Sequence, residues 1–287
     1  MNAKKPMRII VTGANGQLGC ELVNLPLLHQ KGVSILGFGR GGLDVTNLQS
    51  CREVLKRYQP EAVIHCAAFT DVDKAEVERQ EAYRINAEGT RNIVKAAREF
   101  GVKILYVSTS FVFDGAASRP FKENDVPVPL TVYGHSKLAG EREVLLNGAE
   151  AFIVRTSWLY GRYGSNFVEN ICKLANSGKE IQVFNDQLGR PTYARDLAEF
   201  LITLVQTNKY GIYHAAGNGV CSRYQFAQAI LEENKSDTRL LVPCTETSIP
   251  GSASRQAYSV LHQGEIERQG LTPLRHWRAA LTAYMRE

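Results

Sequence analysis

The stretch Arg8-Ile-Ile-Val-Thr-Gly-Ala-Asn-Gly-Gln-Leu-Gly19 decides how the chain folds. Its first half, residues 8–12, is an apolar run typical of a strand that is buried on both faces. Its second half opens a segment that predicts a helix from Gln17 to about Lys31. Glycines at positions 13, 16 and 19 lie between and within the two halves, and glycine permits tight turns and close backbone approach. The stretch therefore predicts a strand, a glycine-rich turn and a helix, in that order.

Outward from this unit, strand and helix patterns alternate as far as residue 156. The expected strands cover residues 33–38, 61–67, 102–108 and 151–156, and the expected helices cover 48–58, 133–146 and, as one or two helices, 75–100. Such alternation is typical of an α/β fold in which helices cover both faces of a parallel sheet. We therefore predict a doubly wound parallel sheet.

The rhythm changes after residue 157. The remaining patterns predict helices at 166–177, 193–206, 223–234 and near Trp277, with strands at 180–184 and 210–215. We therefore expect a first domain of residues 1–156, to which 193–216 return, and a smaller C-terminal lobe formed mainly by 157–287.

The composition is that of an ordinary folded protein: of 287 residues, 44% are hydrophobic and 22% are charged. These values exclude a disordered chain, a collagen-like repeat and a disulfide-dense miniprotein. Lysine plus arginine exceeds aspartate plus glutamate, at 34 against 29, and the excess is spread along the chain. The charge therefore predicts no nucleic-acid partner and suits anionic small molecules such as nucleotides.

Nothing in the sequence predicts a membrane partner or export. No apolar run approaches the roughly 18 residues that a membrane span needs, and the first residues carry no signal-peptide pattern. The 6 cysteines include no Cys-x-x-Cys pair, and the 6 histidines show no metal-ligand spacing. We therefore expect reduced thiols, a cytoplasmic location and no metal site. A monomer and a homodimer both remain open.

The glycine triad after the first strand predicts a dinucleotide site, because the start of the following helix offers free N–H groups to a pyrophosphate. The second strand ends in Gly37-Phe38-Gly39-Arg40, with no acidic residue at its tip. An acidic residue there would hold the ribose 2′-hydroxyl of NADH, whereas arginine accommodates the 2′-phosphate of NADPH. Arg40 therefore favours NADPH and leaves NADH possible; the alternative is a solvated loop cation. Asp44 and Val45 lie just beyond and are expected near the adenine.

A proton-transfer site is predicted by Tyr133 and Lys137, which share one face at the start of a helix. A nearby ammonium group is expected to lower the pKa of the tyrosine. Ser108-Thr109-Ser110 ends the strand before this helix, at the sheet edge where ligands bind. The alternative for a tyrosine and a lysine at this spacing is an ordinary surface pair.

The family resemblance rests on longer motifs. These are His65-Cys-Ala-Ala-Phe-Thr-Asp-Val-Asp-Lys-Ala-Glu76, Ser108-Thr-Ser-Phe-Val-Phe-Asp-Gly115, Val132-Tyr-Gly-His-Ser-Lys137, Arg155-Thr-Ser-Trp-Leu-Tyr-Gly161, Asn166-Phe167, and Asn185-Asp-Gln187 to Arg190-Pro-Thr192. With them the chain resembles the extended short-chain dehydrogenase/reductases and, more narrowly, the dTDP-4-dehydrorhamnose reductase family. The resemblance covers nearly the whole chain. It implies a Rossmann domain, a substrate-binding lobe, and NADPH-dependent reduction of the 4-keto group of dTDP-4-dehydro-L-rhamnose to dTDP-L-rhamnose. It leaves binding of Mg²⁺ open.

The resemblance implies roles for individual residues. Tyr133 would donate the proton, Lys137 would hold the nicotinamide ribose, and Thr109 would polarise the ketone. The cofactor would contact Gly13, Asn15, Gly16, Gln17, Leu18, Gly19, Arg40, Asp44, Val45, Ala67, Ala68, Phe69, Thr70, Tyr133 and Lys137. The dTDP-sugar would contact Thr70, Val72, Thr109, Ser110, Trp158, Asn166, Arg190 and Arg255. The alternatives are core packing for Trp158 and a surface role for Asn166, Arg190 and Arg255.

The sequence differs from the family pattern at two places. Ser110-Phe111 stands where Asp-Tyr is usual, and Gln256 stands where proline usually follows Ser-Arg. Two other functions fit the same motifs. One is another nucleotide-sugar reductase, 4-epimerase or dehydratase, although a 4,6-dehydratase would need acidic residues beside Thr109. The other is a non-catalytic, dinucleotide-binding regulatory subunit, against which the intact Tyr133 and Lys137 argue.

Overall fold

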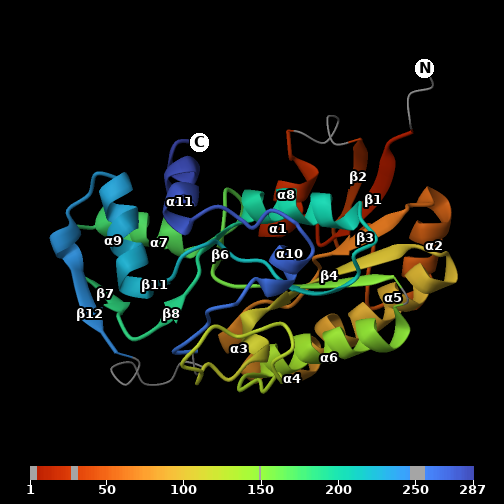
Figure 1. The fold of residues 1–287 in the computed structure, drawn as a ribbon, viewed down its shortest axis with the longest axis horizontal. Helices are drawn as coiled ribbons and strands as arrows, with labels where there is room; N and C mark the ends of the chain where they lie inside the picture. Colours follow the sequence, from red (N-terminus) through yellow and green to blue (C-terminus); the bar gives the residue numbers. More distant parts are fainter. Residues whose placement is uncertain (1–4, 27–31, 149, 246–255) are drawn as a thin grey trace.

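The fold is built on a parallel sheet of six strands, seen in a computed structural model that describes residues 5–26, 32–148, 150–245 and 256–287 (Figure 1). The strand order is β10-β5-β4-β3-β1-β2. The strands are β1 (Met7–Thr12), β2 (Val33–Phe38), β3 (Ala62–His65), β4 (Lys103–Thr109), β5 (Ala151–Thr156) and β10 (Gly211–His214). The predicted doubly wound α/β fold is confirmed.

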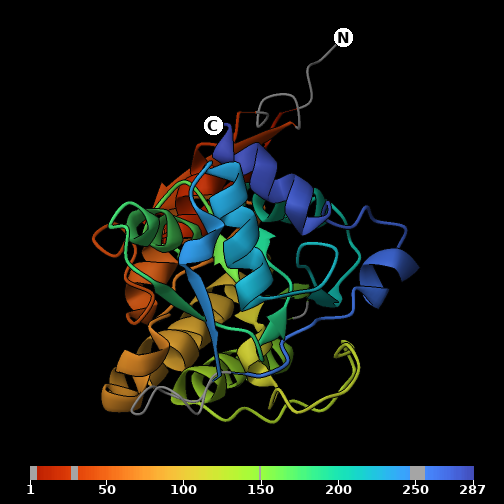
Figure 2. The same cartoon turned by 90° about the vertical axis from the view of Figure 1, so that its left-hand side faces the viewer.

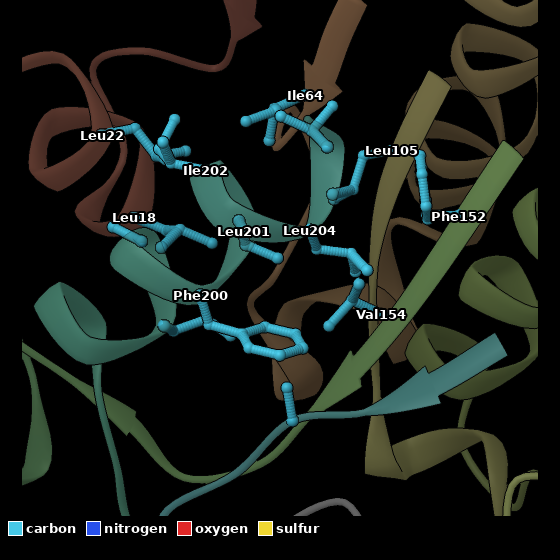
Figure 3. Packing of buried hydrophobic residues seen from close by; sticks show 14 of the residues in the cluster. Leu18, Leu22, Ile64, Leu105, Phe152, Val154, Phe200, Leu201, Ile202 and Leu204 are labelled. Atoms are coloured by element: carbon cyan, nitrogen blue, oxygen red, sulfur yellow. The ribbon is translucent and has the colours of Figure 1, made fainter. Parts of the chain in front are cut away.

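Helices cover both faces of this sheet (Figure 1). One face carries α1 (Gln17–Val23) and α8 (Ala194–Val205), whose leucines and isoleucines meet buried residues of β3, β4 and β5 (Figure 3). The other face carries α2 (Leu48–Tyr58), α5 (Thr90–Glu99) and α6 (Val132–Asn147). Between β3 and α5 the chain forms α3 (Val72–Val77), α4 (Arg79–Tyr83) and the π-helix η1 (Arg84–Gly89). Because both faces are covered, the strands are apolar along almost their whole length.

The prediction that the first helix continues to about Lys31 is wrong. The helix ends at Val23, with Asn24 as its C-cap. Pro26 follows two residues later and has no N–H group to donate to the preceding turn, and it disfavours helical geometry at Leu25. Helix α6, which carries Tyr133 and Lys137, begins where predicted because the hydroxyl of Thr131 accepts a hydrogen bond from the N–H of Gly134.

A second group of elements stands beside the sheet and faces the viewer in Figure 2. Buried side chains of α7, α9 and α11 pack there against β7. The second group contains the helices α7 (Phe167–Ala175), α9 (Arg223–Glu233) and α11 (Trp277–Met285) and the 3-10 helix η3 (Thr238–Leu240). Helix α10 (Gly264–Arg268) packs on β10 of the main sheet, and the 3-10 helix η2 (Ser110–Val112) follows β4 and packs on α6. The strands pair as β6 (Leu159–Tyr160) with β9 (Thr192–Tyr193), β7 (Ile181–Phe184) with β12 (Leu241–Cys244), and β8 (Leu188–Gly189) with β11 (Cys221–Ser222).

The two groups of elements are interleaved along the chain. Strand β10 pairs with β5 at the edge of the main sheet, and α8 packs on α1, although both follow the first elements of the second group. The segment 256–262 connects the groups again: Tyr258 donates a backbone hydrogen bond to Gly115, and Ser259 donates one to Leu188. No helix of the described ranges is long and apolar enough to cross a membrane.

Candidate active site

A cleft of about 550 Å³ lies at the carboxyl edge of the main sheet. Its walls are the segments that follow β1 to β5, together with the first turns of α1 and α6. Strand β1 has β2 on one side and β3 on the other, so the order of the strands reverses beside it. Open α/β sheets bind their ligands outside the carboxyl ends of the strands at such a point.

The glycine loop, which is the turn between β1 and α1, lies directly against the backbone that follows β3. Gly13 has a φ of +65°, and a side chain there would bring its Cβ to 2.7 Å from the backbone of Ala67. A Cβ on Gly19 would lie 2.2 Å from the carbonyl oxygen of Gly13. Only glycine fits both positions without moving backbone. The loop therefore brings its own backbone and the start of α1 directly to the cleft.

Two buried polar atoms in the cleft wall are suited to a bound dinucleotide. The Nε2 of Gln17, one residue after the glycine loop turns into α1, and the Oγ1 of Thr156, at the end of β5, have no hydrogen-bond partner among the described residues. Buried donors and acceptors rarely stay unpaired in folded proteins. A phosphate oxygen accepts from an amide, and a carboxamide or ribose hydroxyl pairs with a threonine, so the residues present fit such a ligand.

The far end of the cleft carries opposite charges close together. Asp44 accepts hydrogen bonds from the N–H and the hydroxyl of Thr46, at 3.0 and 2.8 Å. The bond from the hydroxyl is the main cause of a lowered Asp44 pKa, to which the charge of Arg40 adds. Arg40 itself is exposed and lines the cleft, so its guanidinium is accessible to an anionic ligand.

Tyr133 and Thr109 meet at the centre of the cleft. Tyr133, in the first turn of α6, packs edge-on against Phe111, with 5.5 Å between ring centres. Burial raises the pKa of Tyr133 to about 12, and a hydrogen bond with Thr109 acts in the opposite direction. The expectation that Lys137 lowers the pKa of Tyr133 is therefore not met. Burial outweighs every other effect, and the group that lowers this pKa is the Thr109 hydroxyl.

Lys137 lies one helical turn after Tyr133 and is buried against the sheet. Its Nζ donates to the carbonyl oxygen of Val107 at 2.7 Å and stands 4.0 Å from the ring centre of Tyr106. Burial lowers the pKa of Lys137 to about 7, although the nearby Glu141 and Cys66 favour the charged form. The side chain is thus held in place from two sides while its charge is poorly solvated.

A buried ion pair supports this part of α6. Glu141 accepts from the Nε and Nη2 of Arg155 at 2.9 and 2.7 Å, and both side chains are at most 2% exposed. The hydroxyl of Ser108 donates to the same carboxylate. Arg155 also contacts His214 and the carbonyl oxygen of Glu123. The network joins α6 to the carboxyl ends of β4, β5 and β10.

Trp158 forms the wall of the cleft on the side of the second group of elements. Its φ of +47° is unusual for a residue with a side chain. The guanidinium of Arg223 lies 3.8 Å from the ring centre. A methyl group at Gly189 would come within 2.4 Å of the indole. The ring is therefore fixed by contacts from α9 and β8.

Most residues predicted for the site line this cleft. They are Gly13, Gly16, Gln17, Leu18, Gly19, Arg40, Asp44, Val45, Ala67, Ala68, Thr70, Val72, Thr109, Ser110, Tyr133, Lys137 and Trp158. The structure thus brings the glycine loop, the hydroxyl-rich strand end and the tyrosine–lysine pair into one space.

Four predicted residues do not line the cleft, and Arg255 lies outside the described residues. Asn166 caps α7: its side-chain oxygen accepts from the N–H of Glu169, and its amide nitrogen donates to the carbonyl oxygen of Gly161. The backbone of Phe69 is paired with a buried asparagine, Asn86. Asn15 is exposed beside Gly39. Arg190 is half-buried, which lowers its pKa, and its Nε has no partner in the described part of the chain.

The sequence analysis did not assign other parts of the cleft wall to the site, namely Leu43, Thr46, Cys66, Ile85, Val107, Phe111, Thr156, Ser157 and Leu159, whereas Ser108 was expected at this edge of the sheet. Most of these are neighbours in sequence of predicted residues. Ile85 belongs to the π-helix η1, and no sequence signal pointed to it. Among the residues that the structure describes, no group of three or more histidine, cysteine, aspartate or glutamate side chains is placed to hold a metal ion.

The two positions that differ from the family pattern touch each other. The side-chain amide of Gln256 is hydrogen-bonded to the hydroxyl and to the backbone of Ser110, although 146 residues separate them. Both side chains are buried. The two departures therefore form a single contact at the end of β4.

Comparison with known proteins gives the family. The family model described as RmlD substrate binding domain matches residues 7–287. A dTDP-4-dehydrorhamnose reductase of Streptomyces griseus is 41% identical over 96% of this chain and 92% of its own length. The chain belongs to the dTDP-4-dehydrorhamnose reductase family.

Two further relatives add to this assignment. The spore coat polysaccharide biosynthesis protein SpsK of Bacillus subtilis is 41% identical over 98% of this chain and 97% of its own length. The crystal structure of dTDP-4-dehydrorhamnose reductase from Bacillus anthracis, in complex with NADP, superposes with a TM-score of 0.94 at 38% identity, covering 97% of this chain and 98% of that one. Both the sequence and the fold of the family are thus shared over essentially the full length.

Proposed function

We propose that this protein reduces the 4-keto group of dTDP-4-dehydro-L-rhamnose to give dTDP-L-rhamnose, with NADPH as the reductant. The observation that carries the proposal is the meeting of Tyr133, Thr109 and Lys137 in the cleft that also contains the glycine loop. Membership of the reductase family supports the substrate, and the NADP complex of the Bacillus anthracis relative supports the cofactor.

The cofactor would be held by the backbone of the glycine loop at the pyrophosphate, with Gln17 and Thr156 as partners for its polar groups. Arg40, exposed at the cleft, is placed to bind a 2′-phosphate, which favours NADPH over NADH. When bound, NADPH supplies the hydride. The glycine loop and Tyr133 line the same cleft, which supports binding of the cofactor beside Tyr133.

The chain's own residues supply the proton and the hydrogen bonds that polarise the ketone. Tyr133, with a pKa of about 12, stays protonated at neutral pH and is available to donate its proton to the ketone oxygen as negative charge develops there. The hydroxyl of Thr109, which pairs with Tyr133, orients the same oxygen. Lys137 is held by the carbonyl of Val107 and would donate to a ribose hydroxyl. Trp158 and the C-terminal elements around it would contact the nucleotide-sugar.

The test is direct. The purified protein is incubated with dTDP-4-dehydro-L-rhamnose and NADPH, and both the loss of NADPH absorbance and the sugar product are followed. We expect stoichiometric formation of dTDP-L-rhamnose. Offering the 4-keto sugar of the opposite C5 configuration in parallel distinguishes this substrate from that of another nucleotide-sugar reductase. A protein that binds NADPH but turns over neither sugar would contradict the proposal and favour the regulatory alternative.

A further inference from the structure

The side-chain amide of Gln256 is held at every polar atom. Its Nε2 lies 2.8 Å from the carbonyl oxygen of Ser110 and 2.8 Å from that of Phe113. Its Oε1 lies 3.1 Å from the hydroxyl oxygen of Ser110. The start of the side chain packs on Gly115, where a methyl group would come within 2.8 Å of it. Gln256 is 9% exposed, so these contacts replace those with water.

The chemistry of the partners fixes the direction of each hydrogen bond. An amide nitrogen carries two hydrogens, and backbone carbonyl oxygens can only accept. Both hydrogens of Gln256 are therefore given to Ser110 and Phe113, and the amide cannot be turned around. Its oxygen must then face the hydroxyl of Ser110 as an acceptor, so this hydroxyl donates its one hydrogen to Gln256.

The consequence concerns the cleft, because Ser110 is one of its lining residues and is next to Thr109. A hydroxyl whose hydrogen is committed retains only lone pairs for a further partner. Ser110 therefore has no hydrogen to donate to the ketone oxygen, which leaves that role to Tyr133 and Thr109. What it can bind is a donor, and the donors that a hexose ring carries are its hydroxyl groups.

We propose that Gln256 is a positioning residue that turns position 110 into a neutral hydrogen-bond acceptor for a ring hydroxyl of the sugar. The inference rests on the proposed function only in that the ligand is a dTDP-linked sugar. It assigns Gln256, which no sequence motif singled out as a site residue, to substrate selection, and it assigns Ser110 a direction of hydrogen bonding.

The experiment measures binding rather than turnover. Affinity for dTDP-L-rhamnose, and for dTDP alone, is determined by calorimetry with NADP⁺ present. We expect Ser110→Ala, which removes the acceptor, to weaken dTDP-L-rhamnose binding about five- to tenfold, the range of a lost hydrogen bond. Gln256→Met keeps the length of the side chain but lets the hydroxyl turn, and we expect a loss that is measurable but no larger than that of Ser110→Ala. Affinity for dTDP alone should not change in either variant.

A double variant distinguishes this role from simple packing. If Gln256 acts through Ser110, the Ser110→Ala/Gln256→Met protein binds dTDP-L-rhamnose no more weakly than Ser110→Ala does. The 2-deoxy and 3-deoxy analogues of dTDP-L-rhamnose identify the hydroxyl: with one of them, Ser110→Ala should cause no loss. Melting temperatures measured on the same samples report the structural part of each substitution.

The outcomes separate the two proposals. Wild-type protein that binds dTDP-L-rhamnose, together with Ser110→Ala protein of equal affinity, would overturn the inference and leave the proposed function standing. Losses that add in the double variant would equally overturn it, since Gln256 would then act by another route. Wild-type protein that does not bind dTDP-L-rhamnose at all would overturn the proposed function and, with it, the inference.

Discussion

The buried pair of Glu141 and Arg155 allows a prediction with a matched control. Glu141→Gln keeps the shape of the side chain but removes its charge and turns a donor toward the guanidinium of Arg155. Removing one partner of a fully buried ion pair leaves the other charge uncompensated, which costs about 3–5 kcal/mol. Both side chains are at most 2% exposed, so solvent does not reduce this cost. We expect the free energy of unfolding, measured in urea, to fall by this amount.

The control is Glu99→Gln. Glu99 pairs with Arg52 in the same two-bond geometry, at 2.8 and 2.6 Å, but these side chains are about 40% exposed. Exposed pairs contribute little because water and salt replace the interaction. We expect no measurable change in stability for this variant. Equal losses for Glu141→Gln and Glu99→Gln would refute the reasoning that burial decides the effect of the pair.

The same substitution has a second, independent consequence at Lys137. Burial holds the pKa of Lys137 near 7, and the charge of Glu141 keeps it from falling further. Lys137 is charged below this pKa and loses its charge as the pH rises through it. If the ammonium form is the active one, kcat/KM, which reports the free enzyme, declines above about pH 7. In Glu141→Gln the pKa of Lys137 is lower, so this alkaline decline moves to lower pH, whereas Glu99→Gln keeps the wild-type profile.

Three further predictions concern the cleft. Tyr133→Phe should lower kcat by roughly 10²–10⁴-fold, the usual contribution of a general acid, with NADPH affinity retained; near-normal kcat under conditions where chemistry limits the rate would exclude Tyr133 as the acid. Arg40→Ala should weaken NADPH binding more than NADH binding in a fluorescence titration, because only NADPH offers a 2′-phosphate; equal losses would make Arg40 a general loop residue. Trp158→Ala should raise KM for the nucleotide-sugar and leave dinucleotide affinity unchanged; a lower melting temperature at unchanged KM would assign the ring to packing alone.

The parts of the site that the sequence predicted are those encoded by local spacing. The glycine loop needs Gly13 and Gly19 because backbone atoms fill the space where side chains would be, and a strand and a helix flank it in the sequence itself. Tyr133 and Lys137 share a helix face for the same kind of reason. These features are readable without knowing the fold, since each depends on residues within about one turn or one loop.

The contact between Gln256 and Ser110 could not be predicted, because it joins segments that are far apart in the sequence. Nothing near Gln256 in the sequence indicates that its amide is hydrogen-bonded to Ser110. The chain between the two positions contains most of the second group of elements. Asn166 is a different case: it is a polar residue inside a family motif and was predicted to bind substrate, whereas the structure gives it a local role, since it caps α7 and donates to the carbonyl oxygen of Gly161. A family motif alone does not distinguish a residue that binds substrate from one that stabilises local structure, such as a helix cap.

The pKa values at the centre of the cleft indicate the protonation states of Tyr133 and Lys137. Burial raises the pKa of Tyr133 to about 12 and lowers that of Lys137 to about 7, so it favours the neutral form of both groups. A neutral tyrosine holds the proton that a ketone needs when it is reduced, whereas a tyrosinate would suit the oxidation of an alcohol. Lys137 is only partly charged at neutral pH, and a ligand that accepts hydrogen bonds from its ammonium group would stabilise the charged form. Tyr133 is therefore protonated at neutral pH, as the proposed reduction requires.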